Sequence, residues 1–163
     1  MDLRLAVPST GALHDPAMSF LESCGLAIVR SSTRSYRGEI PAIAGLVVHF
    51  QRAADITMSV ENGSSDLGIV GMDDFLEKRR EGGNSEVLIE GLGFGHCEVV
   101  VGVPDFWADV TSVADLADLS TELKGQGDGL LRVATKFPRL TERFLLENGF
   151  NYFSIRQASG ALE

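Results

Sequence analysis

Short apolar runs alternate along the chain with longer segments in which apolar residues recur at every third or fourth position. The first run, residues 3–7, predicts a buried strand. The following segment has helical spacing as far as about Cys24, and Gly25 stands where a helix C-cap belongs. Residues 26–30 predict a second strand. The polar stretch "SSTRSYRGEIPAIAG" predicts a loop with a short hairpin.

The same alternation continues through the rest of the chain. In the middle it predicts strands at 46–50 and 65–71, helices over 54–62 and from the glycine turn to about Arg80, and adjacent strands at 87–91 and 97–103. In the last third it predicts a helix over 112–119, the glycine-rich loop "KGQGDG", and then a strand, a helix ending at Gly149 and a final strand.

Alternating strands and helices predict the α/β class, with largely parallel sheets flanked by helices. A break in composition precedes the paired apolar runs at 87–103, which we interpret as a crossover between two α/β lobes. The lobes would comprise residues 1–92 and 93–163. In such sheets, ligands bind outside the carboxyl ends of the strands, where backbone N–H groups at helix N-termini attract anions.

Composition narrows the classes of partner. The chain is 44% hydrophobic and 23% charged, which is ordinary for a globular protein able to bury a core without disulfides or metal. Its net charge of −9 argues against nucleic acid as a partner but leaves small anionic substrates open. Cys24 and Cys97 lack metal-ligand spacing and predict reduced, half-buried thiols. Without a signal peptide or an apolar run of ~20 residues, we expect a soluble cytoplasmic protein with no membrane partner.

Several motifs, in register along the chain, resemble one family. These are "LRLAVPSTGAL" near the start, "QRAADI", "ENGSSDLGIVGMDDFLE", "LGFGHCEVVVGVP" and "LRVATKFPRLTERFLLENG". Together they are similar to the catalytic subunit of ATP phosphoribosyltransferase, which performs the first step of histidine biosynthesis. No one of these motifs would be enough, but their shared order covers essentially the whole chain.

The resemblance implies two α/β lobes similar to type II periplasmic binding proteins, with substrates between them. It also implies a pentosyl-transferring glycosyltransferase reaction, in which N1 of the ATP adenine is joined to C1 of phosphoribosyl pyrophosphate. Pyrophosphate leaves with the assistance of Mg²⁺. Departure of pyrophosphate develops negative charge, which a metal ion and preorganised N–H donors stabilise, and the nucleophilic nitrogen needs positioning more than covalent chemistry.

The family's phosphoribosyl pyrophosphate loop matches the end of the chain, where glycine allows a close backbone approach and successive N–H groups form an anion nest. The implied phosphoribosyl pyrophosphate contacts are Ser159, Gly160, Ala161, Leu162 and Glu163, with Arg52 and Thr135. Arg52 has a plainer interpretation, as a surface ion pair with Asp55. Thr135 has one too, as part of a solvated turn before Pro138.

For ATP, the resemblance implies contacts at Gly11, Asp66, Gly68, Gly71 and Asp73. The alternative is an ordinary strand-to-helix turn at positions 66–71, with Asp73 capping the next helix. No residue is assigned as catalytic or as a metal ligand. The three histidines have no spacing that suggests a metal site.

Departures from the family pattern bear on activity. Ser9 and Ala12 stand where the family has a lysine and an arginine, and Glu98 stands where it has an arginine. Loss of three cations should weaken polyphosphate binding. A non-catalytic two-lobed ligand-binding paralogue, or a structural partner of a complete homologue, therefore stays open as an alternative.

Family members continue beyond the point that Glu163 matches, so we expect a truncated or naturally short member. The resemblance also implies a homo-oligomer. Short forms of the family pair with a regulatory subunit resembling histidyl-tRNA synthetase, and longer forms carry a histidine-binding regulatory domain, so such a partner is a further expectation.

Overall fold

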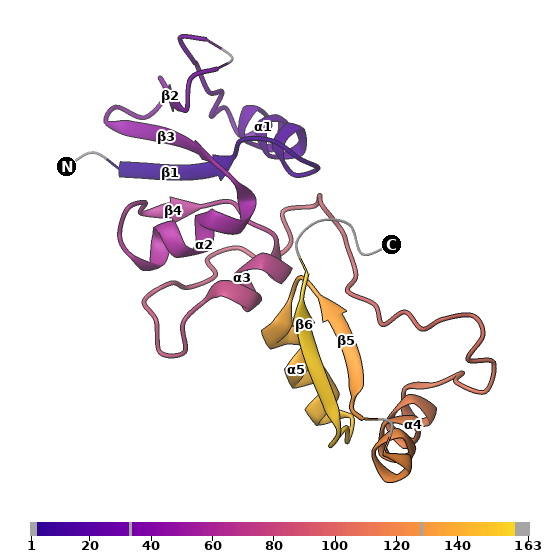
Figure 1. Ribbon diagram of the computed structural model, residues 1–163. Helices are drawn as coiled ribbons and strands as arrows, with labels where there is room; N and C mark the ends of the chain where they lie inside the picture. Colours follow the sequence, from indigo (N-terminus) through magenta and orange to yellow (C-terminus); the bar gives the residue numbers. More distant parts are fainter. Residues whose placement is uncertain (1–2, 33, 128, 159–163) are drawn as a thin grey trace. The chain divides into compact units, whose positions relative to one another are not determined.

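The computed structural model describes residues 3–32, 34–127 and 129–158 and divides into two compact units, Met1–Glu98 and Val99–Glu163 (Figure 1). The sequence placed the lobe boundary after Leu92, and the division falls after Glu98. Each unit has its own hydrophobic core and combines strands with helices, so the predicted α/β class is confirmed.

The first unit is built on a four-stranded sheet in the order β2-β3-β1-β4. The strands are β1 (Leu3–Pro8), β2 (Arg37–Glu39), β3 (Leu46–Gln51) and β4 (Leu67–Gly68). β1 lies parallel to both β3 and β4, and β2 is the antiparallel edge strand. The three parallel strands therefore have their carboxyl ends at one edge of the sheet.

Helices cover both faces of this sheet (Figure 1). They are α1 (His14–Ser23) on one face and α2 (Ala53–Glu61) on the other, and α3 (Met72–Lys78) packs against α2. Successive side chains of a strand point to opposite faces, so Leu5 and Val7 pack with Leu21 of α1, whereas Ala6 lies on the α2 side. Ala6 and Ile56 of α2 are both fully buried. Because β3 ends at Gln51, α2 begins at the carboxyl edge of the sheet.

The second unit contains α4 (Val113–Gln126), β5 (Leu131–Thr135), α5 (Pro138–Glu147) and β6 (Phe153–Gln157). β5 and β6 form a two-stranded parallel sheet, and α5 connects them. Its core is small, with four buried apolar residues: Leu116, Leu131, Leu145 and Phe150. In α4 the Ser112 hydroxyl accepts from the Asp115 N–H, and the Asp115 carboxylate accepts from the Ser112 N–H, which forms a capping box.

Three expectations about elements were wrong. Residues 26–30 form no strand but only a bridge between Val29 and Glu39. The runs 87–91 and 97–103 form no strands either, and none of the backbone hydrogen bonds found among the described residues involves them. Leu88 and Val100 are 74% and 76% exposed. An apolar pattern sets strand propensity but does not supply the neighbouring edge that a strand requires.

The third wrong expectation concerns the length of α4. The helix runs well past residue 119 into the predicted glycine-rich loop. It ends at Gly127, which takes the left-handed conformation with φ 81° that suits a helix C-cap. Cys24 and Cys97 are free, as predicted, but exposed instead of half-buried. In the part of the chain that the structure describes, no helix is both long and apolar enough to span a membrane.

Candidate functional site

The carboxyl edge of the first sheet gathers most of the predicted site residues of the first unit. Gly11 follows β1, Arg52 follows β3, and Gly71 follows β4. The Ser9 N–H donates to the Gln51 carbonyl at 2.7 Å, so the loops after β1 and β3 leave the sheet together. This edge is where ligands bind in open α/β sheets.

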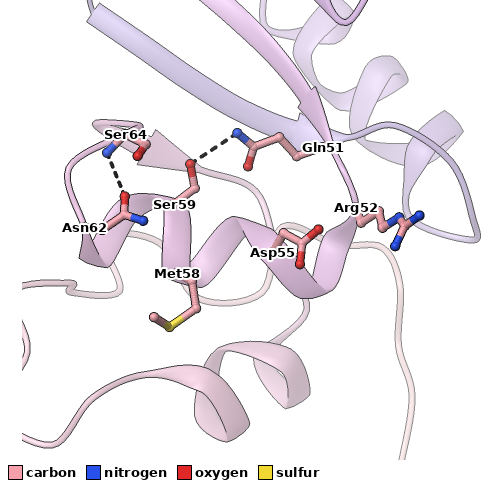
Figure 2. A pocket seen from close by; sticks show the side chains of 7 residues that line it. All are labelled: Gln51, Arg52, Asp55, Met58, Ser59, Asn62 and Ser64. Carbon is pink, nitrogen blue, oxygen red and sulfur yellow. Dashed lines mark hydrogen bonds between the residues drawn. The ribbon is translucent and has the colours of Figure 1, made fainter. Parts of the chain in front are cut away.

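A hollow of about 440 Å³ lies beside α2 and reaches this edge (Figure 2). It is lined by Gln51, Arg52, Asp55, Met58, Ser59, Asn62 and Ser64. Arg52 is the N-cap residue of α2 and has an extended backbone, with φ −66° and ψ 138°. Six of the seven lining residues are polar or charged, in contrast to the apolar core on the other face of β3.

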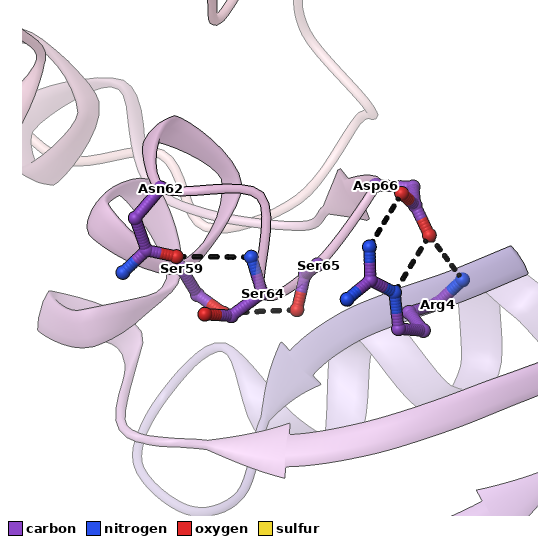
Figure 3. A network of polar contacts seen from close by, with 6 residues as sticks. All are labelled: Arg4, Ser59, Asn62, Ser64, Ser65 and Asp66. Atoms are coloured by element: carbon purple, nitrogen blue, oxygen red, sulfur yellow. Dashed lines mark hydrogen bonds and ion pairs between the residues drawn. The ribbon is translucent and has the colours of Figure 1, made fainter.

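A line of hydrogen bonds holds the wall of the hollow. Gln51 Nε2 donates to Ser59 Oγ at 3.2 Å, and Ser59 Oγ lies 2.9 Å from Ser65 Oγ. At the far end, Asn62 Oδ1 accepts from the Ser64 N–H at 2.9 Å (Figures 2 and 3). Gln51 Oε1 is buried and has no hydrogen-bond partner among the described residues. A buried amide oxygen without a partner is unusual and costly.

Arg52 and Asp55 are both exposed, and neither forms an ion pair with a described residue. The Asp55 N–H donates to the Arg52 carbonyl at 2.9 Å, which begins α2, but the two side chains do not meet. The interpretation of these residues as a surface ion pair is therefore wrong. Within the described part of the chain, two opposite charges therefore stand unpaired at the rim of one hollow.

Asp66 lies at the other end of the sheet. It directly precedes β4 and stands beside Arg4 near the start of β1 (Figure 3). Its carboxylate accepts from the Arg4 N–H at 2.8 Å, from Nε at 3.0 Å and from Nη2 at 2.9 Å. The hydrogen bonds from the Arg4 side chain, more than those from its backbone, lower the pKa of Asp66. Asp66 therefore lies away from Arg52, and its ion-pair partner is Arg4.

The glycines have different surroundings. A Cβ added at Gly68 would meet the side chains of Ile56 and Val60, so Gly68 allows α2 to pack closely on β4. A Cβ added at Gly71 would meet the Asp73 carboxylate, and Gly71 is the N-cap residue of α3. Gly11 has φ +85° and open space around it, as suits a turn that a ligand can approach. Asp73 lies in the first turn of α3 and makes no capping hydrogen bond.

In the second unit, Thr135 ends β5 and is buried. Its Oγ1 accepts from the Phe137 N–H at 3.0 Å and from Thr141 Oγ1 at 2.9 Å. The hydroxyl therefore shapes the turn that leads to Pro138 at the start of α5. The predicted phosphate loop, Ser159 to Glu163, lies outside the described residues and stays a prediction.

Sequence reasoning missed Gln51 and Ser59 as site residues. A signal was present, because Asp55, Ser59 and Asn62 recur at helical spacing and form a polar stripe on α2. It also missed Glu61, whose carboxylate accepts hydrogen bonds from Ser85 Oγ and, at 3.4 Å, from the Arg80 N–H. The bond from Ser85 is the main reason why the pKa of Glu61 is lowered.

Each comparison with known proteins finds similarity to ATP phosphoribosyltransferases. The family model described as ATP phosphoribosyltransferase (HisG) matches residues 52–163. An ATP phosphoribosyltransferase of Rhodopseudomonas palustris (strain BisA53) is 38% identical over 160 residues, which cover 98% of this chain and 49% of the relative. One from Chelativorans sp. (strain BNC1) is 36% identical over 165 residues, covering all of this chain and 72% of the relative. The chain thus spans about half the length of some curated relatives.

A solved structure shares the fold. The ATP phosphoribosyl transferase (HisG:HisZ) complex from Thermotoga maritima contains a chain that matches with a TM-score of 0.58 and 24% identity. The match covers 98% of this chain and 66% of that one.

Proposed function

The chain belongs to the ATP phosphoribosyltransferase family, and on that premise we propose that it transfers the phosphoribosyl group of phosphoribosyl pyrophosphate to N1 of ATP and releases pyrophosphate. This pentosyl-transferring glycosyltransferase reaction is the first step of histidine biosynthesis. The observation that carries the proposal is the 36% identity to the Chelativorans enzyme across the whole chain. Because the chain spans only part of its relatives, the complete activity belongs to the proposal.

Arg52 is the residue of the first unit best suited to a phosphate. Its guanidinium has no carboxylate partner among the described residues and lies at the carboxyl edge of the sheet. A planar guanidinium donates two parallel hydrogen bonds to a phosphate group. Since the chain carries a net charge of −9, binding of a polyphosphate depends on such local cations.

Gly11, Gly71 and Asp73 are the proposed nucleotide contacts that remain at this edge. Gly11 lets the loop after β1 approach a ligand closely, and Gly71 begins α3. We leave Asp66 and Gly68 out of the proposed site, because the first is engaged by Arg4 and the second is required for packing against Ile56. Thr135 would act by shaping the turn that leads from β5 to α5.

Mg²⁺ is proposed as the cofactor. Across the described ranges, no group of three or more histidine, cysteine or acidic side chains is placed to hold a metal ion. The described residues therefore do not form a metal site by themselves. Mg²⁺ would bind as a complex with the substrate phosphates, as is common for this ion.

The substitutions Ser9, Ala12 and Glu98 reduce the positive charge available to substrates, which places more weight on Arg52. A non-catalytic ligand-binding paralogue is the alternative, and none of the comparisons favours it. A homo-oligomer, a cytoplasmic location and a regulatory subunit resembling histidyl-tRNA synthetase complete the proposal. The Thermotoga structure, a HisG:HisZ complex, supports the last of these.

The test is an assay with ATP, phosphoribosyl pyrophosphate and Mg²⁺ in which mass spectrometry detects phosphoribosyl-ATP. It is run on this chain and on this chain joined to the part of the Chelativorans relative that the match does not cover. We expect product from the joined protein. Absence of product from a joined protein that is folded and binds neither substrate would refute the proposal.

A further inference from the structure

The loop between β1 and α1, residues 9–13, is closed at its base by His14. The imidazole Nδ1 lies 2.7 Å from the Pro8 carbonyl oxygen, and the His14 N–H donates to the Gly11 carbonyl at 3.1 Å. Because a carbonyl oxygen only accepts, Nδ1 carries a hydrogen and donates it. His14 therefore holds the loop twice, once at the end of β1 and once within the turn.

The imidazole is itself held in place. Its ring meets the edge of the buried Phe50 ring, with the two centroids 6.2 Å apart and an angle of 62° between the planes. Such an edge-to-face contact is a favoured arrangement of two rings. On the other side of the imidazole, Nε2 lies 3.9 Å from Asp15 Oδ1, and Asp15 is exposed, so that contact adds little. The hydrogen bond to Pro8 is therefore the main polar contact of the ring.

This hydrogen bond is not a helix cap. Leu13 is the N-cap residue of α1, and no side chain caps the helix there. A capping side chain accepts a hydrogen bond from an N–H of the first turn, whereas His14 donates to the end of β1. The contact joins the strand to the helix across the loop, so its effect falls on the loop.

The loop offers backbone groups to a ligand in place of charged side chains. Its sequence, "STGAL", has no charged residue. The Ser9 N–H donates to the Gln51 carbonyl. None of the hydrogen bonds found in the described chain uses the N–H of Thr10, Gly11 or Ala12, and all three residues are exposed. Free N–H groups bind a ligand well only while the backbone keeps their directions, so binding here depends on a fixed loop conformation.

We infer that His14 is a positioning residue for nucleotide binding, whose imidazole holds residues 9–13 in the conformation that presents their free N–H groups to the nucleotide. The inference rests on the proposed function for the nucleotide as the ligand of this loop. His14 acts through the loop and without touching the ligand. The role requires a donor at the position of Nδ1, so another side chain with a donor there should replace it.

Two substitutions separate the donor from the ring. His14→Asn keeps the donor, because asparagine Nδ2 is as many bonds from the backbone as imidazole Nδ1. His14→Phe keeps an aromatic ring against Phe50 but has no donor. His49→Phe is the control, because it makes the same change at a half-buried histidine within β3 and outside the loop. Thermal unfolding by circular dichroism confirms that the variants are folded.

The first measurement needs no ligand. Backbone ¹⁵N order parameters of residues 10–12 report motion of the loop on the picosecond to nanosecond timescale. They should fall in His14→Phe and keep their wild-type values in His14→Asn and His49→Phe. The ¹⁵N shifts of the wild-type His14 ring should identify Nδ1 as a protonated nitrogen. Unchanged order parameters in His14→Phe would overturn the inference, since the loop would then keep its conformation without the donor.

The second measurement is calorimetry of this chain with ATP. His14→Phe should lower the affinity about threefold to tenfold, as expected for the loss of one hydrogen bond, and His14→Asn should restore it. The affinity for phosphoribosyl pyrophosphate should stay the same in each variant. In the joined protein, His14→Phe should raise KM for ATP and leave kcat unchanged. A general loss of stability would produce neither this selectivity nor the rescue by asparagine.

The outcomes separate this inference from the proposed function. Equal ATP affinity of the wild type and His14→Phe would overturn the inference, as would a wild-type chain that does not bind ATP. Phosphoribosyl-ATP formed by the joined protein would support the transferase in either case. Selective loss of ATP affinity in His14→Phe, with no phosphoribosyl-ATP from the joined protein, would support the role of His14 and count against the transferase.

Discussion

The carboxyl and amino edges of the first sheet each carry an arginine and an aspartate, which among the described residues are paired at one edge and unpaired at the other. At the amino edge, Arg4 and Asp66 are 62 positions apart in sequence, yet Arg4 donates three hydrogen bonds to the Asp66 carboxylate. At the carboxyl edge, Arg52 and Asp55 are close in sequence and remain unpaired among the described residues. Closeness in sequence therefore did not decide which charges pair. The edge with unpaired charges is the one where α/β proteins bind ligands.

The parallel register explains the paired edge. Leu5 lies opposite Leu67, which places Arg4 beside Asp66 at the start of both strands. The Asp66 N–H also donates to the Arg4 carbonyl at 2.9 Å, so the ion pair continues the ladder between β1 and β4. The charges of Arg4 and Asp66 therefore hold β1 and β4 together. Those of Arg52 and Asp55 serve no contact within the described chain.

The largest effect is expected when the arginine at each edge is replaced, because one should contribute to ligand binding and the other to stability. Arg52→Ala should weaken binding of phosphoribosyl pyrophosphate about tenfold to a hundredfold, because a charge-assisted hydrogen bond to phosphate is lost, and leave the thermal midpoint nearly unchanged. Arg4→Ala is the matched variant at the other edge, and should lower the thermal midpoint while leaving affinity unchanged. Equal loss of affinity in both variants would remove the distinction between the edges.

Gly68→Ala should act on stability alone. The new Cβ would press on Ile56, which is fully buried, and such overpacking costs about 1–3 kcal/mol in the free energy of unfolding. Urea unfolding measures the change. Gly102→Ala is the control, because an added Cβ there meets nothing within 4 Å. A variant Gly68→Ala that keeps its stability but loses nucleotide affinity would restore Gly68 to the binding site.

The Arg4–Asp66 pair predicts a smaller effect that depends on pH. Arg4 holds the pKa of Asp66 below its ordinary value of 3.8, so the stabilisation is fully present above that value and is lost as the pH falls through the lower folded pKa. Asp66→Asn should therefore be less stable than the wild type at pH 7, and the difference should shrink below about pH 4. A difference that stays constant with pH would contradict this account.

The smallest effect is expected at Glu61, where the loop after α3 returns to the end of α2. Ser85 and the Arg80 N–H both donate to its carboxylate. Glu61→Gln should speed hydrogen exchange in residues 80–85 without changing exchange in β1 or β3, because the loop loses its charged acceptor. Unchanged exchange in that loop would show that its own turns hold it.

The sequence alone predicted strands and helices well wherever apolar periodicity and helix caps indicate the same element. The strands at β1, β3 and β5 and the helix ended by Gly149 follow directly from apolar spacing and glycine positions. The runs at 87–91 and 97–103 have the same local pattern, yet strand formation depends on a partner edge that local pattern does not encode. The Arg4–Asp66 pair was hidden for a similar reason, since strand register decides it.

The motif pattern predicts Arg52 and the turns at Gly11 and Gly71 as site residues, and the structure places all three after strand ends of the first sheet. It could not tell that Gly68 is needed against Ile56, since a glycine required for packing and one required for a ligand look alike in sequence. Gln51 escaped notice because its position depends on a hydrogen bond to Ser59 in the wall of the hollow, which the sequence does not show.

Amide chemical shifts during a titration with phosphoribosyl pyrophosphate and Mg²⁺ test most directly whether the carboxyl edge of the first sheet is the ligand-binding edge. We predict the largest shifts in the first unit at Arg52, Asp55 and Gly71, and little change at Arg4 and Asp66. Saturable shifts centred on Arg4 and Asp66, with Arg52 and Asp55 unaffected, would contradict the account.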